Sequence, residues 1–123
     1  MDLVKLVYTH GSYDYKEATS RAMELIGIFL SSNVGSSGSS FKEFGLNTHE
    51  QHTSGNTIYL EKSNNHIVLS DLYDQGKNPT KVSMSIQQYI YLIDAWEKQV
   101  CKNMPKEIII KYDNDQFFIE TYD

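Results

Sequence analysis

The sequence predicts an α+β fold, with an antiparallel or mixed sheet of about five to six strands and two helices packed on it. Two observations lead to this prediction. Strand-like runs flank two short Asn-containing turns, and two segments that open on helix-capping residues repeat apolar side chains at helical spacing. The 123 residues suit a single domain, 1–123, which at this length can bury roughly two-thirds of the surface of its unfolded chain.

The first predicted elements are a strand and a helix. Residues 3–9 are rich in Val and Leu and alternate weakly, which indicates a strand, and His10–Tyr13 has the composition of a turn. Asp14, with Glu17 three residues later, is typical of an N-cap with a reciprocal partner. We therefore expect a helix from about Tyr15 to Ser31.

The next region is less regular. Residues 25–30 contain a glycine and two isoleucines, so a strand competes there with the helix, although the cap favours the helix. A loop is expected over about residues 32–56, where residues 36–40 are all Ser or Gly and no period is clear. Loops of this length are uncommon in compact domains, which predicts a mobile or functional segment.

A hairpin is predicted in the middle of the chain. Thr57–Lys62 and His66–Asp71 read as strands, and the Asn64-Asn65 pair between them tolerates the positive φ angles of a tight turn. Asp74–Thr80, with its Gly and Pro, is expected to be a loop. Lys81–Met84 is expected to add a short strand.

The second helix is predicted from Ile86 to about Lys102. Ser85 and Gln88 have the spacing of a capping box, and Asn103-Met104-Pro105 ends the pattern. One face of this helix is apolar and should pack on the sheet; it is made by Ile86, Tyr89, Ile90, Ile93, Trp96 and Val100.

A second hairpin is predicted at the carboxyl end. Lys106–Tyr112 and Gln116–Tyr122 flank Asn114-Asp115, which again has the chemistry of a two-residue turn. Pairing residue 112 with residue 117 separates the side chains into two faces. The expected core face holds Ile108, Ile110, Tyr112, Phe117, Ile119 and Thr121. The other face mixes charge with exposed aromatic side chains and is expected to face a partner; it holds Glu107, Ile109, Lys111, Phe118, Glu120 and Tyr122.

The acidity of the chain is concentrated in residues 113–123. This segment has four acids and no base, and so holds four of the five net negative charges. An acidic segment with aromatic side chains suits docking on a basic protein. The net charge of −5 and the single arginine, Arg21, argue against nucleic acid as a partner, because phosphate binding needs a track of cations.

The compartment follows from what the chain lacks. One cysteine, Cys101, cannot form an internal disulfide, which is typical of a reducing environment. The first residues do not form a signal peptide, and no apolar run reaches membrane-spanning length. We therefore expect a cytoplasmic protein that has no membrane partner.

Catalytic and metal sites are weighed against simpler interpretations. His49 and His52 have a spacing that can begin a metal site, but further ligands at metal-site spacing are missing. The chain contains the residue types of a nuclease that uses histidine as general acid and base, but their spacing does not indicate a site. These residues are His10, His49, His52 and His66, with Lys62. The Asp pairs at 71 and 74 and at 113 and 115 fall in turns, where Asp is expected for backbone reasons. No catalytic residue, metal or cofactor is predicted.

A family resemblance covers residues 85–122, about a third of the chain. The residues that carry it are Ser85-x-x-Gln88-x-Ile90, Leu92-Ile93-Asp94-x-Trp96-Glu97, Val100-Cys101-Lys102, Pro105-Lys106-Glu107-Ile108-Ile109-Ile110-Lys111 and Phe117-x-Ile119-Glu120-Thr121. This run resembles the C-terminal part of small bacterial immunity proteins that accompany polymorphic or contact-dependent growth inhibition toxins. The resemblance implies a cytoplasmic, non-enzymatic inhibitor that binds one cognate toxin domain, often a nuclease, and covers its active site.

The toxin-binding candidates follow from the acids and aromatics of this sequence. They are Asp71, Tyr73 and Asp74 after the first hairpin, and Asp113, Asp115, Glu120 and Tyr122 on the last. The expected state is a monomer or a 1:1 heterodimer with a basic toxin domain. Two other functions are kept open: a small histidine-dependent hydrolase or nuclease, and a non-enzymatic adaptor subunit.

Overall fold

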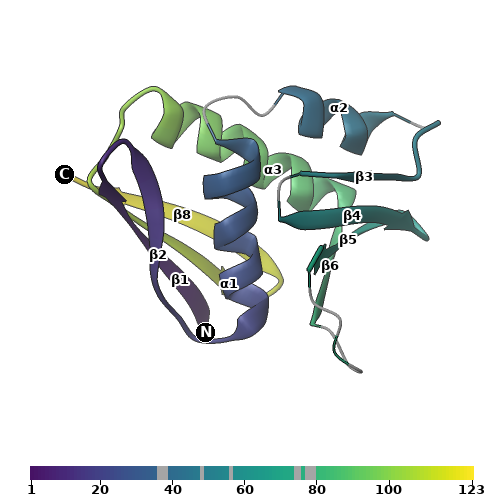
Figure 1. The fold of residues 1–123 in the computed structure, drawn as a ribbon, viewed down its shortest axis with the longest axis horizontal. Helices are drawn as coiled ribbons and strands as arrows, with labels where there is room; N and C mark the ends of the chain where they lie inside the picture. Colours follow the sequence, from purple (N-terminus) through teal and green to yellow (C-terminus); the bar gives the residue numbers. More distant parts are fainter. Residues whose placement is uncertain (36–38, 48, 56, 74–75, 77–79) are drawn as a thin grey trace.

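The structure is a computed structural model that describes residues 1–35, 39–47, 49–55, 57–73, 76 and 80–123 (Figure 1). Over these residues the fold is α+β, as predicted, but its strands form two four-stranded antiparallel sheets and it has three α-helices. The prediction of one sheet with five to six strands and two helices was therefore wrong in its counts. No helix among the described residues is long and apolar enough to cross a membrane.

The first sheet joins the two ends of the chain. Its order is β2-β1-β7-β8, with β1 at Asp2–Thr9, β2 at Ser12–Ala18, β7 at Glu107–Asp113 and β8 at Gln116–Tyr122. The predicted register is confirmed, because Tyr112 pairs with Phe117. All three pairs of neighbouring strands are antiparallel, and β8 and β2 lie at the two edges.

Strand β2 replaces the start of the predicted first helix. His10 and Gly11 have positive φ angles of 50° and 92°, which a tight turn between antiparallel strands requires. Asp14 therefore lies within a strand, where its carboxylate accepts a hydrogen bond from the Thr9 hydroxyl instead of capping a helix. The helix α1 runs from Arg21 to Ile28, and its N-cap is Ser20, which accepts from the backbone N–H of Met23 at 3.2 Å.

The second sheet is built from the middle of the chain. Its order is β3-β4-β5-β6, with β3 at His52–Ser54, β4 at Ile58–Ser63, β5 at His66–Asp71 and β6 at Lys81–Ser85. The predicted Asn64-Asn65 turn is confirmed, with φ angles of 50° and 65°. The predicted short strand at Lys81–Met84 is confirmed as β6.

The predicted loop over 32–56 is partly structured. It contains the helix α2, Ser39–Leu46, and the strand β3. Helix α2 is held by distant residues: Tyr89 donates its hydroxyl to the Phe41 carbonyl at 2.6 Å, and the Phe44 side chain is buried. Burial raises the pKa of the Tyr89 hydroxyl far above its usual value. Residues 36–38, within the Ser/Gly run, lie outside the described residues.

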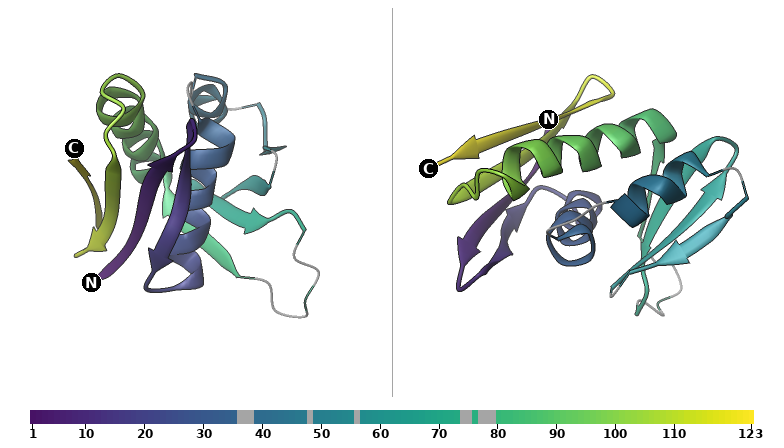
Figure 2. Two further views of the ribbon diagram at one scale, coloured as in Figure 1. Left: turned by 60° about the vertical axis from the view of Figure 1, so that its left-hand side comes forward. Right: turned by 90° about the horizontal axis from the view of Figure 1, so that it is seen from above.

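Helices α1 and α3 lie between the two sheets, as Figure 2 shows. Helix α3 spans Ile86–Trp96 and continues as a π-helical segment to Cys101, which confirms most of the predicted second helix and its capping box of Ser85 and Gln88. Helix α1 likewise continues as a π-helical segment, Phe29–Val34. Both sheets therefore turn one face toward the same pair of helices.

The core fills the space on both sides of the helices. Of the side chains predicted on the core face of the last hairpin, Tyr112 is half-buried and Thr121 is exposed, because they lie near the two ends of the sheet. The other four are buried, namely Ile108, Ile110, Phe117 and Ile119. Trp96, predicted to be core, is 1% exposed, and its indole N–H donates to the Gly35 carbonyl at 2.8 Å.

Helix α1 approaches β1 so closely that Gly27 leaves no room for a side chain. A Cβ at Gly27 would lie 2.9 Å from a methyl carbon of the fully buried Val4. We expect Gly27→Ala to lower the free energy of unfolding by about 1–3 kcal/mol, because overpacking outweighs the usual helix preference for Ala. Urea unfolding measures this, and the loss should shrink when Gly27→Ala is made in a Val4→Ala background. A gain in stability from Gly27→Ala alone would contradict the close packing.

Candidate functional site

The tip of the β7–β8 hairpin is held by its own side chains. Asn114 and Asp115 have φ angles of 52° and 61°, which confirms the predicted two-residue turn. Tyr112 donates its hydroxyl to Asp115 Oδ1 at 3.0 Å, and its ring lies 4.8 Å from that of Phe117. The turn therefore has a fixed shape in which the carboxylates of Asp113 and Asp115 are exposed.

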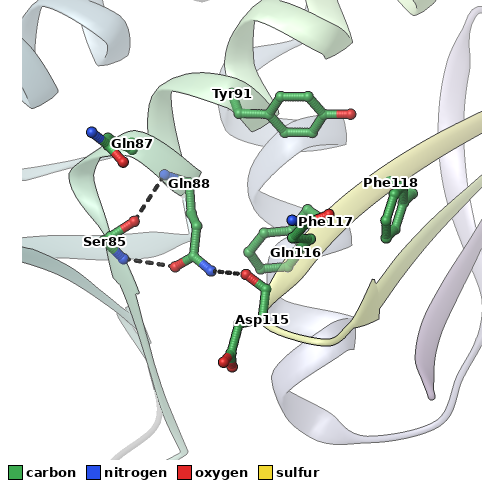
Figure 3. Close-up of a pocket in the computed structure, with 8 residues that line it drawn as sticks. All are labelled: Ser85, Gln87, Gln88, Tyr91, Asp115, Gln116, Phe117 and Phe118. Carbon is green, nitrogen blue, oxygen red and sulfur yellow. Dashed lines mark hydrogen bonds between the residues drawn. The ribbon is translucent and has the colours of Figure 1, made fainter.

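Gln88 connects this hairpin to the start of helix α3. Its side-chain oxygen accepts from the Ser85 N–H at 2.8 Å, and the Ser85 hydroxyl accepts from the Gln88 N–H at 3.0 Å. The side-chain NH₂ of Gln88 then donates to the Asp115 carbonyl at 2.8 Å (Figure 3). One capping residue thus fixes the hairpin tip relative to the first turn of the helix.

A groove of about 500 Å³ lies between the hairpin and helix α3, and we call it the edge groove because it borders the outer edge of β8. Its walls come from the helix on one side and the strand on the other (Figure 3). Tyr91 is 43% exposed and Phe118 is 45% exposed, as expected for side chains that point away from the core. The groove is lined by Ser85, Gln87, Gln88, Tyr91, Asp115, Gln116, Phe117 and Phe118.

The outer face of the first sheet is turned away from both helices (Figure 2). Two ion pairs cross it: Lys5 Nζ lies 2.7 Å from a Glu107 oxygen, and Lys111 Nζ lies 2.7 Å from a Glu120 oxygen. Tyr122 also donates its hydroxyl to Glu120 at 3.0 Å. The hydrogen bond from Lys111, followed by that from Tyr122, lowers the pKa of Glu120 below its usual value.

The seven predicted toxin-binding residues differ in solvent exposure and in ion pairing. Asp113 and Asp115 are exposed and have no cation within ion-pair distance among the described residues. Glu120 is paired with Lys111, so it carries less free charge than the sequence count implied. Tyr122 is 48% exposed beside it.

The other group of candidates follows β5. The Asp71 carboxylate lies 2.7 Å from the Arg21 guanidinium, which neutralises it, and Tyr73 is 70% exposed. Asp74 lies outside the described residues. Of the first group, Asp113 follows Tyr112, which pairs with Asp2 near the N-terminus, whereas Tyr122 lies at the other end of the first sheet, opposite Glu107.

A second, smaller cavity of about 170 Å³ is lined by residues of helix α1, strand β6 and the end of the β7–β8 hairpin. Its lining includes Ser20 and Ala22, which flank Arg21 in sequence, and Tyr112, which bonds Asp115. Asp2 also lines it and adds an exposed acid that no local sequence pattern indicates. The missing signal was the pairing of Asp2 with Tyr112 between strands that are far apart in sequence.

The histidines considered for catalysis are dispersed. His10 lies in the β1–β2 turn of the first sheet, whereas His49, His52 and His66 lie at the second sheet, and all four are exposed. His52 stacks on Tyr59 with ring centroids 6.3 Å apart. Within the described ranges, no group of three or more His, Cys, Asp or Glu side chains is placed to hold a metal ion.

No family model, curated protein or solved structure matches this chain. Support for a function therefore comes from the residues of this chain and their geometry, together with the sequence resemblance of residues 85–122.

The Lys111–Glu120 pair predicts a pH-dependent contribution to stability. Because pairing lowers the pKa of Glu120 in the folded state, its contribution is full above the ordinary value of 4.5 and is lost as pH falls through the lowered value. We expect Lys111→Met to destabilise the protein slightly at pH 7 and much less at pH 3, measured by urea unfolding. Lys106→Met is the control, because Lys106 is exposed and has no ion pair among the described residues. An equal effect of Lys111→Met at both pH values would contradict the pairing.

Gln88 makes separate hydrogen bonds to the hairpin tip and to the helix cap, so a substitution can remove the first and keep the second. Gln88→Glu keeps an oxygen for the Ser85 N–H but removes the donor to the Asp115 carbonyl. We expect faster amide hydrogen exchange at Gln116 and Phe118, with little change in the first turn of α3. Gln87→Glu introduces the same charge next door and should leave both regions unchanged. Unaltered exchange at the tip in Gln88→Glu would show that the bridge is dispensable.

Proposed function

We propose that this chain is an immunity protein that binds a cognate bacterial toxin domain and covers the basic region of its active site. One observation carries the proposal: Asp113 and Asp115 present exposed carboxylates, with no cationic partner in the described part of the chain, beside a groove walled by exposed aromatic side chains. The resemblance of residues 85–122 to immunity proteins concerns the same helix and hairpin.

The physics of such a complex fits the toxin class that the resemblance implies. A nuclease needs a cationic groove for phosphates, and an acidic surface is attracted to that groove over a distance set by salt screening. Carboxylates mainly accelerate encounter and set orientation, whereas buried aromatic anchors give most of the affinity. Asp113 and Asp115 serve the first role in this proposal, and Tyr91, Phe118 and Tyr122 serve the second.

The proposed complex is a 1:1 heterodimer formed in the cytoplasm, without nucleic acid, membrane or cofactor. The protein acts by occupying the toxin and carries out no reaction of its own. The dispersed, exposed histidines give no specific support to the hydrolase alternative, and nothing among the described residues favours an adaptor.

Co-expression tests the proposal directly. On this proposal, the gene immediately upstream should encode a toxin domain that stops growth when expressed alone, and co-expression of this chain should restore growth and yield a co-purifying complex. Failure of both rescue and co-purification would contradict the proposal. An activity of the purified protein on RNA that disappears in His10→Ala or His66→Ala would favour the hydrolase instead.

Charge reversal tests the assigned residues. We expect Asp113→Lys with Asp115→Lys to slow association with the toxin domain by about tenfold or more at low salt, because electrostatic steering is reversed. Glu43→Lys with Glu50→Lys is the matched control, since both acids are exposed and lie near α2 and β3, away from the hairpin tip. Stopped-flow association at several salt concentrations measures the rates. Equal rates for the two double variants would remove Asp113 and Asp115 from the interface.

A further inference from the structure

Strand β8 has an unpaired backbone along its outer edge. Tyr8 N–H donates to the Lys106 carbonyl at 2.8 Å, which fixes the phase of the alternating bonds between β1 and β7. Every second residue of β7 therefore bonds to β1 through its backbone. The residues of β7 between them bond to Gln116, Phe118, Glu120 and Tyr122 of β8. The backbone N–H and C=O groups of Phe117, Ile119 and Thr121 consequently point outward. Among the described residues, no hydrogen bond joins these groups to another segment.

The other three sheet edges are protected in ways that β8 is not. Strand β2 carries Asp14, Lys16 and Glu17 and has a register shift where it pairs with β1, and both features discourage further pairing. Strand β3 has only three residues. Strand β6 has five residues and ends at Ser85, whose N–H is already bonded to Gln88.

Strand β8 is the long and regular edge of the four. It pairs with β7 over seven residues without a register shift, and its one charged side chain, Glu120, is neutralised by Lys111. Long edges with little free charge invite the addition of another strand. The edge groove lies beside the start of this strand and has room for an extended segment, whose side chains would meet Tyr91 on one side and Phe118 on the other.

Charge decides which strand fits. Asp113 and Asp115 precede β8 and Asp123 follows it, and none of the three has a cationic partner among the described residues. If a second copy of this chain paired antiparallel with β8 about Ile119, Asp115 of each copy would lie opposite Asp123 of the other, and the copy would add another five net negative charges. Like charges at this spacing are unfavourable, so self-pairing is opposed and a strand that carries Lys or Arg is favoured.

We propose that β8 extends its sheet by one strand supplied by the cationic toxin domain, so that backbone hydrogen bonds to Phe117, Ile119 and Thr121 hold the complex. The inference rests on the proposed function and specifies its binding mode. The incoming strand alternates apolar residues, which meet the exposed aromatic side chains, with Lys or Arg near its ends, which meet the flanking carboxylates.

Hydrogen exchange tests the alternation. In the free protein, the amides of Phe117, Ile119 and Thr121 should exchange fast, and those of Phe118 and Glu120, bonded to β7, should exchange slowly. In the complex with the toxin domain encoded upstream, the three outward amides should slow by at least about tenfold. If the toxin domain binds and these amides keep their free-state rates, the edge is not the site although the proposed function stands.

A proline pair gives an independent test. Thr121 is exposed and its N–H points outward, so Thr121→Pro removes a donor that the folded chain does not use and adds bulk to the edge. Tyr15→Pro is the matched control on the opposite edge, because Tyr15 is exposed and lies opposite Leu6, whose backbone pairs with β7 instead.

The expected result is a Kd for the toxin domain that rises at least about tenfold in Thr121→Pro and stays near the wild-type value in Tyr15→Pro. Circular dichroism melting checks that each variant is folded before binding is measured. Equal affinity of the two variants for the toxin domain overturns the inference. If the wild-type protein does not bind the toxin domain, the proposed function is overturned as well.

Discussion

The pairing of β1 with β7 is the constraint on which the other features depend. It joins residues 100 to 110 positions apart, and it places Val4 beside Ile110 and Leu6 beside Ile108, all four fully buried. Because β1 occupies one side of β7, β8 must take the other side and becomes the edge of the sheet. The same pairing fixes the platform on which α1 packs, with Gly27 against Val4. The hairpin, the edge groove and the open strand all follow from this contact.

Local chemistry predicted the elements that local interactions determine. The Asn64-Asn65 and Asn114-Asp115 turns and the Ser85–Gln88 capping box formed as expected, because each depends on neighbouring residues alone. Asp14 and Glu17 imitated a helix start, but pairing of β2 with β1 overrode the local preference. Helix α2 was missed because its support from Tyr89 comes from 48 residues away. The division into two sheets was missed for the same reason, since no local pattern specifies strand order.

The sequence predicted which side chains of the last hairpin are exposed, but it did not predict which of the candidate carboxylates are paired with a cation. Exposure of Phe118 and Tyr122 followed from the register, which was predicted correctly. The same register places Lys111 opposite Phe118 and therefore diagonal to Glu120. The predicted register was thus sufficient to predict the Lys111–Glu120 ion pair. The pairing of Asp71 with Arg21 is different, because it needs α1 and β5 to be neighbours in three dimensions.

The contact between Trp96 and Gly35 has a spectroscopic consequence. Trp96 is the single tryptophan of the chain and is 1% exposed. Its indole N–H is bonded to the carbonyl of Gly35, which directly follows the first π-helical segment. It lies ten residues along α3 from Ile86, or about 15 Å at the rise of an α-helix, and so is remote from the hairpin tip. Intrinsic fluorescence is thus a native optical reporter of interior integrity. It can separate a variant that fails to fold from one that folds and has lost its partner.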